Sequence, residues 1–228
     1  MPDQSPFESI EVQGEDNIRL YYSPGACSLA PHILLEELNI SYQLELTSVA
    51  EEKTASPAFL IINPKGRVPV LEVNRTILTE APAILVYLAL AYPHASLLPS
   101  QPLARFRCLE WLNWLSSTVH AIGYGQLWRP ARFINDSAQF ENISTKGREN
   151  IVEAYRQIER LLSGKSWSVE NDYSCVDPYL LVFYSWGAAT GLAMQTEYPA
   201  WSAHAARVLA RDAVRRAIEQ EGLTLSLA

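Results

Sequence analysis

Hydrophobic and polar residues alternate near the start of the chain with the two-residue period of half-buried β-strands. This alternation covers residues 18–22 and 42–46. An apolar run at 70–73 follows a turn-rich stretch, and a second tight turn separates it from a partner strand at 76–78. The pattern therefore predicts four short strands.

Between these strands the apolar spacing changes to the helical period. Helices are predicted at 28–38, 57–62 and 80–92, and Pro82 falls in a first turn, where its missing N–H costs little. The order β-α-β-α-β-β-α within about eighty residues is typical of an α/β domain with mixed strand direction. We expect this domain to occupy residues 17–94.

Beyond Pro93 the pattern becomes wholly helical. The proline-containing stretch 95–102 is expected to be a linker, and 103–228 an all-α domain. Residues 1–16 are polar and acidic and are expected to form a loose N-terminal arm. Amphipathic helices are predicted at 103–122, 145–163, 175–191 and 203–221.

Charge and cysteine content narrow the class of protein. The net charge is −7 without a basic cluster, which argues against nucleic acid or an anionic membrane as the main partner. No apolar run is long enough to cross a bilayer, and the first residues lack the apolar core of a secretory signal. Three widely spaced cysteines are neither a disulfide framework nor a metal motif. We expect a cytoplasmic protein without a metal.

The stretch from Asn63 to Leu71 joins turn dipeptides to the start of a strand. Pro69 is unusual there, because proline has no N–H to give to a central ladder. If the Val68–Pro69 bond is cis, Val68 presents its own N–H and C=O to an extended peptide, as a neighbouring strand would. The alternative is an ordinary trans turn, which this segment alone favours because cis is the minority isomer.

Cys27 stands between a turn and a helix N-terminus, where the helix dipole and free N–H groups favour a thiolate. A small buried cysteine is the equally weighted alternative. Ala30, three residues on, excludes a two-cysteine motif. Packing is the prediction for Cys108 and Cys175.

Glu80, at a helix start, could accept from a ligand ammonium while neighbouring N–H groups bind a carboxylate, an arrangement that suits an α-amino acid head group. The alternative is a glutamate favoured by the helix dipole alone. His120 is a candidate donor or base, although a lone histidine is more often a satisfied or exposed side chain. Nearby aromatic residues could form core, interface or the wall of an apolar pocket: Trp111, Trp114, Tyr124, Trp128 and Phe133.

The stretch Ser174–Asp177 has the S-x-x-D pattern of a capping box. In such a box the Ser174 hydroxyl and the Asp177 carboxylate satisfy free N–H groups at a helix start. The pattern predicts a fixed start for a helix within the all-α domain.

Three motifs together resemble the beta class of bacterial glutathione S-transferases. They are Tyr21-Tyr22-Ser23-Pro24-Gly25-Ala26-Cys27-Ser28-Leu29-Ala30-Pro31-His32, Ile62-Asn63-Pro64-Lys65-Gly66-Arg67-Val68-Pro69-Val70-Leu71 and Leu78-Thr79-Glu80. The similarity covers nearly the whole chain after residue 17 and includes the capping box and Glu110-Trp111-Leu112-Asn113. It implies a thioredoxin-like domain followed by an all-α domain, and a homodimer with two glutathione sites.

The resemblance also implies roles for individual residues. Val68 would pair with the cysteinyl backbone of glutathione, and Cys27 would lie beside the glutathione sulfur. Glu80 and Ala81 would hold the γ-glutamyl group, and Lys53, in a loop whose register is open by one residue, would meet the glycyl end. Further residues would line the site, some of them from across the dimer: Asn113, Ser117 and His120.

Three positions depart from the family pattern. Ala81 offers only its N–H where glycine or serine is usual, and Ala121 stands where the beta class has lysine. Pro178 occupies a position that would normally supply a helical N–H.

Three functions follow as hypotheses. The first is a transferase that adds glutathione to small apolar electrophiles. The second is a glutathione-dependent thiol–disulfide reductase that works through a mixed disulfide on Cys27. The third is a protein that binds glutathione or an apolar ligand with little turnover. Ala121 slightly favours the second and third.

Overall fold

The computed structural model describes residues 17–169 and 172–225. The expected N-terminal arm at 1–16 lies outside the described residues. Within the described residues, no helix is long and apolar enough to cross a membrane.

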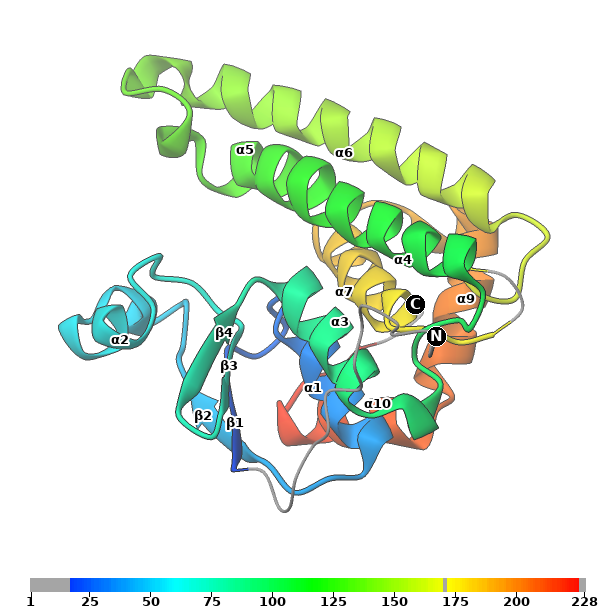
Figure 1. Ribbon diagram of the computed structural model, residues 1–228. Coiled ribbons are helices and arrows are strands. Elements are labelled where there is room, and N and C mark those ends of the chain that lie inside the picture. Colours follow the sequence, from blue (N-terminus) through cyan, green and yellow to red (C-terminus); the bar gives the residue numbers. More distant parts are fainter. Residues whose placement is uncertain (1–16, 170–171, 226–228) are drawn as a thin grey trace, which may run out of the picture.

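A four-stranded sheet forms the base of the α/β part (Figure 1). Its strands are β1 (Ile18–Tyr22), β2 (Gln43–Leu46), β3 (Val70–Val73) and β4 (Thr76–Thr79), in the spatial order β2-β1-β3-β4. β1 runs parallel to β2 and antiparallel to β3, and β3 is antiparallel to β4. The mixed strand direction predicted from the sequence is therefore confirmed.

The helices of this part are α1 (Leu29–Leu38), α2 (Pro57–Ile62) and α3 (Ala81–Ala91), with short 3₁₀ turns η1 (Lys53–Ala55) and η2 (Pro93–Ala95). All three helices lie where the sequence predicted them.

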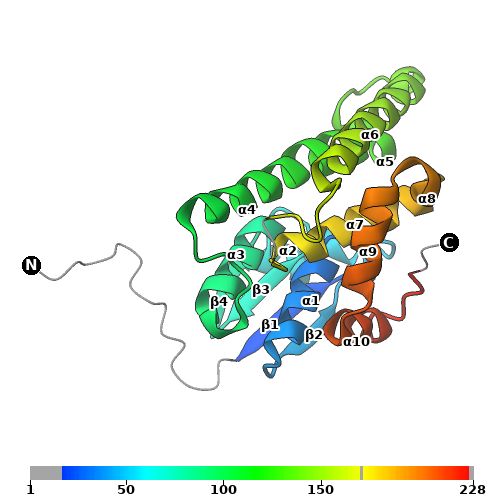
Figure 2. The same cartoon turned by 90° about the vertical axis from the view of Figure 1, so that its right-hand side faces the viewer.

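The alternation of β1 divides its side chains between the two faces of the sheet. Leu20 packs into the large core with α1 and α3, whereas Tyr21 belongs to a small cluster with Phe59 of α2 and Val70. Helices α1 and α3 thus cover one face, and α2 contributes to the other (Figure 2).

The remainder of the described chain contains no strand and is mostly helical. Its elements are α4 (Pro102–Trp114), a π-helical segment η3 (Leu115–Tyr124), α5 (Gly125–Trp128), η4 (Pro130–Arg132), η5 (Ser137–Gln139), α6 (Phe140–Leu162), α7 (Val176–Ala189), α8 (Met194–Glu197), α9 (Pro199–Leu209) and α10 (Asp212–Gln220).

Helix boundaries in this part correct the sequence predictions in three places. The helix predicted at 103–122 changes from α to π geometry at Leu115. The helix predicted to begin at 145 already begins at Phe140. The single helix predicted at 203–221 is two helices, because the chain leaves helical geometry at Arg211 (ψ 136°) and starts α10 at Asp212.

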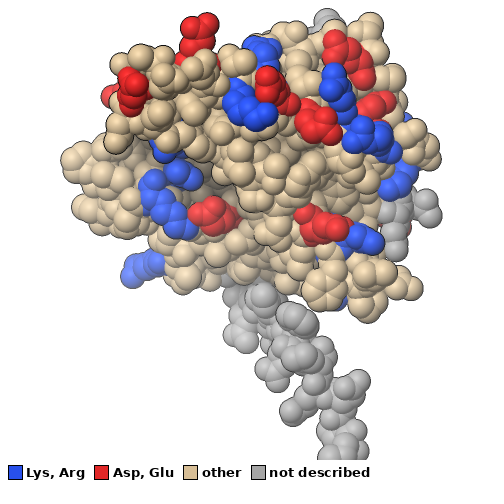
Figure 3. All heavy atoms as spheres, turned by 90° about the horizontal axis from the view of Figure 1, so that it is seen from above, with Lys and Arg blue, Asp and Glu red and all other residues tan. Residues whose placement is uncertain are grey.

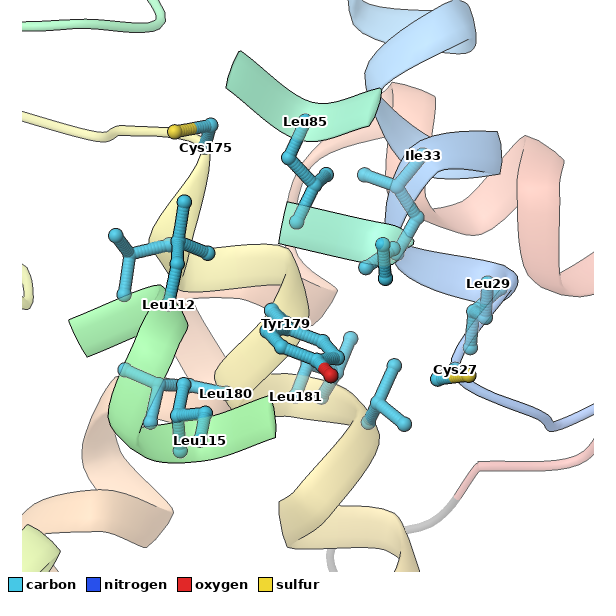
Figure 4. Packing of buried hydrophobic residues seen from close by; sticks show 14 of the residues in the cluster. Cys27, Leu29, Ile33, Leu85, Leu112, Leu115, Cys175, Tyr179, Leu180 and Leu181 are labelled. Atoms are coloured by element: carbon cyan, nitrogen blue, oxygen red, sulfur yellow. The ribbon is translucent and has the colours of Figure 1, made fainter. Parts of the chain in front are cut away.

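One hydrophobic core joins the α/β and all-α parts. Figure 4 shows Leu29 and Ile33 of α1 and Leu85 of α3 facing Tyr179 and Leu181 of α7. Helix α7 contacts both α1 and α4, so it lies between the sheet layer and the outer helices (Figure 1). The site that follows is built where these two parts meet.

Candidate active site

The turn before α1 carries Cys27 and is fixed from several sides. Gly25 has φ +69°, a left-handed conformation that glycine adopts without steric cost. Its N–H donates to Glu221 Oε2 (2.9 Å), and its C=O accepts from Trp186 Nε1 (2.8 Å). The Ser28 hydroxyl closes the turn by hydrogen bonds to Ser23 N and O, both 3.1 Å. The position of Cys27 therefore depends on α7 and on the end of α10.

Glu221 is held in turn by a buried histidine. Glu221 Oε1 lies 2.9 Å from His32 Nδ1, and both side chains are fully buried. The other ring nitrogen, Nε2, lies 2.7 Å from Gln220 Oε1. Because Gln220 Nε2 donates to Glu36, its Oε1 is the acceptor for His32.

The second element of the site is the turn before β3, where the Val68–Pro69 bond is cis. Asn63 Nδ2 donates to Arg67 O (2.7 Å) and fixes this turn. Val68 is buried, and its C=O accepts the S–H of Cys27 across 3.5 Å. The structure thus brings Cys27 and Val68 into direct contact.

Burial raises the pKa of the Cys27 thiol to about 12. Its own backbone N–H and the charges of Arg129 and Arg67 lower the pKa, and Glu80 raises it further, but desolvation is the largest effect. The expectation that the helix N-terminus favours a thiolate is wrong for this form of the protein. Cys27 is a thiol at neutral pH, and its S–H is a hydrogen-bond donor.

The third element is the start of α3. Glu80 precedes the first helical residue and has φ 73°, a left-handed conformation that is strained for a residue with a side chain. Its carboxylate pairs with Lys65 at 2.7 Å, and Lys65 also donates to Thr79 Oγ1. Ala81 begins the helix and is buried. A strained, exposed carboxylate at a helix N-terminus is the arrangement expected of a ligand-binding position.

His120 approaches the same place from η3. Its ring packs edge-on against Trp186 (5.0 Å between ring centroids) and Phe183 (6.1 Å). Burial and the charges of Arg67, Arg129 and Arg132 lower the His120 pKa to about 4. His120 is therefore neutral at physiological pH, so one ring nitrogen carries an N–H donor and the other can accept a hydrogen bond.

Other predicted site residues make only local contacts. Lys53 lies in η1, where its half-exposed side chain pairs with Glu51. Asn113 Nδ2 donates to Leu109 O and Ser117 Oγ to Asn113 O, both along their own helix. No hydrogen bond or ion pair in the described ranges joins these three side chains to Cys27.

Two residues of the site were missed by the sequence analysis. Trp186 connects α7 to the Cys27 turn and to His120. The Tyr179 hydroxyl points toward Cys27 (Figure 4), and the two groups interact electrostatically. Burial raises the pKa of Tyr179 well above its usual value, so its hydroxyl is also a donor. Both sit on α7 at a separation of more than 150 residues from Cys27, where only the fold can place them.

The predicted capping box is confirmed at the start of α7. Asp177 Oδ2 accepts from the backbone N–H of Ser174 (2.7 Å) and from its hydroxyl (3.1 Å), and Ser174 Oγ accepts from Val176 N (3.3 Å). Pro178 is buried in the first turn of the helix, where a missing N–H leaves no bond unmade. Cys108 and Cys175 are fully buried, as the packing prediction requires.

Comparisons with known proteins identify the family. Residues 17–90 match the model of the glutathione S-transferase N-terminal domain. Glutathione S-transferase GstA of Escherichia coli O157:H7 is 31% identical over 210 residues, which is 90% of this chain and 100% of the relative. The chain belongs to the glutathione S-transferase family.

Solved structures agree with this assignment. A glutathione transferase homologue from Sulfitobacter with bound glutathione has a TM-score of 0.85 at 31% identity and covers 91% of this chain and 99% of its own. The bacterial beta-class enzyme of Sphingomonas chungbukensis has a TM-score of 0.77 at 32% identity, with 90% and 100% covered. The chain is thus a bacterial-type member with the thioredoxin-like and all-α architecture of the family.

Proposed function

We propose that this protein binds glutathione and transfers its thiol to small electrophiles. The observation that carries this proposal is the contact between Cys27 and the C=O of Val68, beside Glu80 at the start of α3. A tripeptide laid along Val68 would make strand-like backbone hydrogen bonds there. Its sulfur would then lie next to the Cys27 thiol.

The two ends of glutathione would meet different groups. Glu80 would accept from the γ-glutamyl ammonium, and the N–H of Ala81, at a helix N-terminus, would donate to the adjacent carboxylate. We assign the glycyl carboxylate to Lys53, whose side chain is half exposed and free to turn away from Glu51. Asn113 and Ser117 complete the proposed binding set from the all-α part.

Catalysis would require an ionised glutathione thiol, since the thiolate is the nucleophile. The Cys27 S–H and the Tyr179 O–H would donate hydrogen bonds to that thiolate, and the proton would pass to solvent. His120, whose pKa is lowered to about 4, would stay neutral and could offer its ring N–H as a further donor. The thiolate would then form a C–S bond with the electrophile, and the leaving group would depart with the electron pair of the broken bond. A protonated Cys27 is a poor nucleophile, which is why transfer is favoured over disulfide reduction.

Aromatic side chains would hold the electrophile. Trp128 and Phe133 are 48% and 43% exposed, and the Trp128 ring packs against Tyr124 (4.5 Å) and Trp186 (5.0 Å). An exposed aromatic surface beside His120 suits a flat apolar compound.

We also propose a homodimer located in the cytoplasm. Leu103 and Phe106, three residues apart on α4, are each 66% exposed, and large apolar side chains grouped in this way mark association surfaces. Light scattering coupled to size exclusion should give the mass of two chains. The mass of one chain would contradict the dimer.

The transferase is tested with 1-chloro-2,4-dinitrobenzene and glutathione. Glu80→Gln should raise the KM for glutathione about tenfold or more, because a charge-assisted hydrogen bond is lost. Glu149→Gln is the matched control, since Glu149 forms an equally exposed pair with Lys146 on α6. Absence of conjugation by the wild-type protein, or equal KM values for both variants, would contradict the proposed site.

Intact mass after purification without reductant separates conjugation from reductase chemistry. We expect no dithiothreitol-removable glutathione adduct on Cys27, because its thiol is buried and protonated. An adduct that is absent from Cys27→Ala would favour the reductase instead.

A further inference from the structure

Three arginines near the site have no partner for their charges among residues 17–169 and 172–225. Arg67, Arg129 and Arg132 form no ion pair and no side-chain hydrogen bond with any of the residues that the structure describes. All three side chains are exposed, so water can satisfy their N–H donors. Three unpaired guanidinium charges gathered in one place nevertheless favour the binding of an anion.

The fold brings the three arginines together from two parts of the chain. Arg67 immediately precedes Val68, whose C=O contacts Cys27. Arg129 immediately follows Trp128, whose ring packs on Trp186, and Trp186 packs on His120. Arg132 closes η4, and the hydrogen bond from its N–H to Arg129 O (3.0 Å) holds the two residues on one short turn.

Electrostatic interactions place the three charges near the same side chains. Arg67 and Arg129 both act on Cys27 and on His120, Arg132 also acts on His120, and the carboxylate of Glu80 acts on both with opposite sign. After burial, the charges of Arg129 and Arg67 lower the pKa of Arg132. Seen from above, Lys and Arg side chains gather beside a hollow in the surface (Figure 3).

The proposed glutathione site does not use Arg129 or Arg132. The carboxylates of glutathione are assigned above to Ala81 and Lys53, on the α/β part, which also contains Arg67. Arg129 and Arg132 lie instead on the turn that follows Trp128, on the side of His120 where the electrophile would sit.

We propose that Arg67, Arg129 and Arg132 bind a carboxylate carried by the electrophilic substrate, whose aromatic body lies on Trp128. Planar guanidinium groups match a carboxylate in geometry as well as charge. The substrate class is thus an aromatic electrophile with an anionic substituent, which narrows the small apolar class inferred from the sequence. The description of this ligand as an electrophile rests on the proposed transferase function. Carboxylate binding at the three arginines can be measured without turnover.

The first experiment measures binding by calorimetry with two unreactive probes, 3,5-dinitrobenzoate and 3,5-dinitrobenzamide. The two compounds have the same ring and differ in charge. We expect the benzoate to bind about tenfold more tightly to the wild-type protein, as one charge-assisted contact would give. Arg129→Gln and Arg132→Gln should abolish this preference, and Arg132→Lys should keep part of it because the charge remains.

Arg75→Gln is the control for loss of one positive charge. Arg75 lies in the turn between β3 and β4, at the opposite end of β4 from Glu80, and should leave the preference unchanged. Equal binding of the two probes to the wild-type protein would overturn the proposal. It would also be overturned if the Arg129 and Arg132 variants raised the KM for glutathione as much as they weakened benzoate binding, because the arginines would then serve glutathione.

The second experiment measures kcat/KM for 4-chloro-3,5-dinitrobenzoate and its methyl ester, each divided by its uncatalysed rate with glutathione. The acid-to-ester ratio should fall about tenfold in Arg132→Gln and stay constant in Arg75→Gln. Preferential binding of the benzoate without any conjugation would support the anion site and contradict the transferase function. Conjugation without a preference for the carboxylate would support the transferase function and contradict the anion site.

Discussion

Glu221 and Asp177 are both carboxylates with fully buried side chains, and each contacts a histidine ring nitrogen at 2.8–2.9 Å. Glu221 shares its oxygens between His32 and the N–H of Gly25, so it contacts residues 189 and 196 positions away. It joins the end of α10 to the turn that carries Cys27.

Asp177 has the more complete set of partners, all within the all-α part. Oδ1 accepts from Ser168 N (2.9 Å) and contacts His204 Nε2 (2.8 Å), while Oδ2 accepts from Ser174. His204 Nδ1 has no partner among residues 17–169 and 172–225, whereas both ring nitrogens of His32 are bonded. The same chemical pair thus fixes a helix start in one region and a functional turn in the other.

The largest effect should come from Asp177→Ala. Removing this carboxylate leaves His204 and two backbone N–H groups buried without an acceptor, so the free energy of unfolding should fall by about 3–5 kcal/mol. Urea denaturation measures it. Asp212→Ala removes an exposed carboxylate paired with Arg215 and should cost about 1 kcal/mol or less. Similar losses in the two variants would mean that burial does not distinguish these carboxylates.

Glu221→Ala should lower the free energy of unfolding somewhat less, by about 2–4 kcal/mol, because fewer hydrogen bonds are broken. The reactivity of Cys27 distinguishes this variant from Asp177→Ala. Iodoacetamide at neutral pH should alkylate Cys27 faster in Glu221→Ala than in wild type, because the turn opens locally more often. Asp177→Ala, measured in conditions where it is folded, should react at the wild-type rate. Equal acceleration of Cys27 alkylation in both variants would show that Glu221 supports the Cys27 turn no more than Asp177 does.

Unlike His32 and His204, His120 forms no ion pair with a carboxylate among the residues that the structure describes. Its folded pKa of about 4 lies below the unfolded value of about 6.5, so the unfolded chain binds the proton first as pH falls. The contribution of His120 to the free energy of unfolding is highest above pH 6.5 and falls by about 2 kcal/mol in all towards pH 4. This figure allows for the partial exposure of the ring. His120→Gln should remove this part of the acid dependence, and His94→Gln, at an exposed position, should retain it. An unchanged profile in His120→Gln would show that other groups cause the acid loss.

The smallest effect should come from an exposed ion pair. Lys65 and Glu80 form this pair, and both side chains are more than half exposed. Lys65→Gln should therefore change the free energy of unfolding by less than about 1 kcal/mol. Urea denaturation beside the Glu221 variant measures the contrast. A loss as large as that of Glu221→Ala would mean that Lys65 supports the strained backbone of Glu80 as well as its charge.

The sequence predicts well whatever short-range patterns determine. The alternation in β1 and the proline in the first turn of α3 identify their elements directly, and Ser174 and Asp177 are three residues apart, so the capping box is visible as a motif. The break at Arg211 escapes prediction because the apolar spacing continues across it from α9 into α10. The π geometry of η3 likewise has no local signal.

Long-range features of the site could not be predicted from the residues alone. Glu221 and Trp186 support the Cys27 turn from separations that no periodicity reports. The Cys27 prediction was wrong about the thiolate because burial depends on α7 and α3, whereas the helix N-terminus is visible in the sequence. Arg129 and Arg132 are neighbours on one turn, but Arg67 lies far from them in the sequence, and only the fold brings it near His120.

The bond between Gly25 and Glu221 has a consequence for protein synthesis. A ribosome adds about 5–20 residues each second, so the 196 positions between these residues correspond to about 10–40 s. The sheet and its first helix can be complete long before that time has passed. The Cys27 turn acquires its carboxylate anchor only after Glu221 has been made, so this turn waits about 10–40 s after its own synthesis for the hydrogen bond.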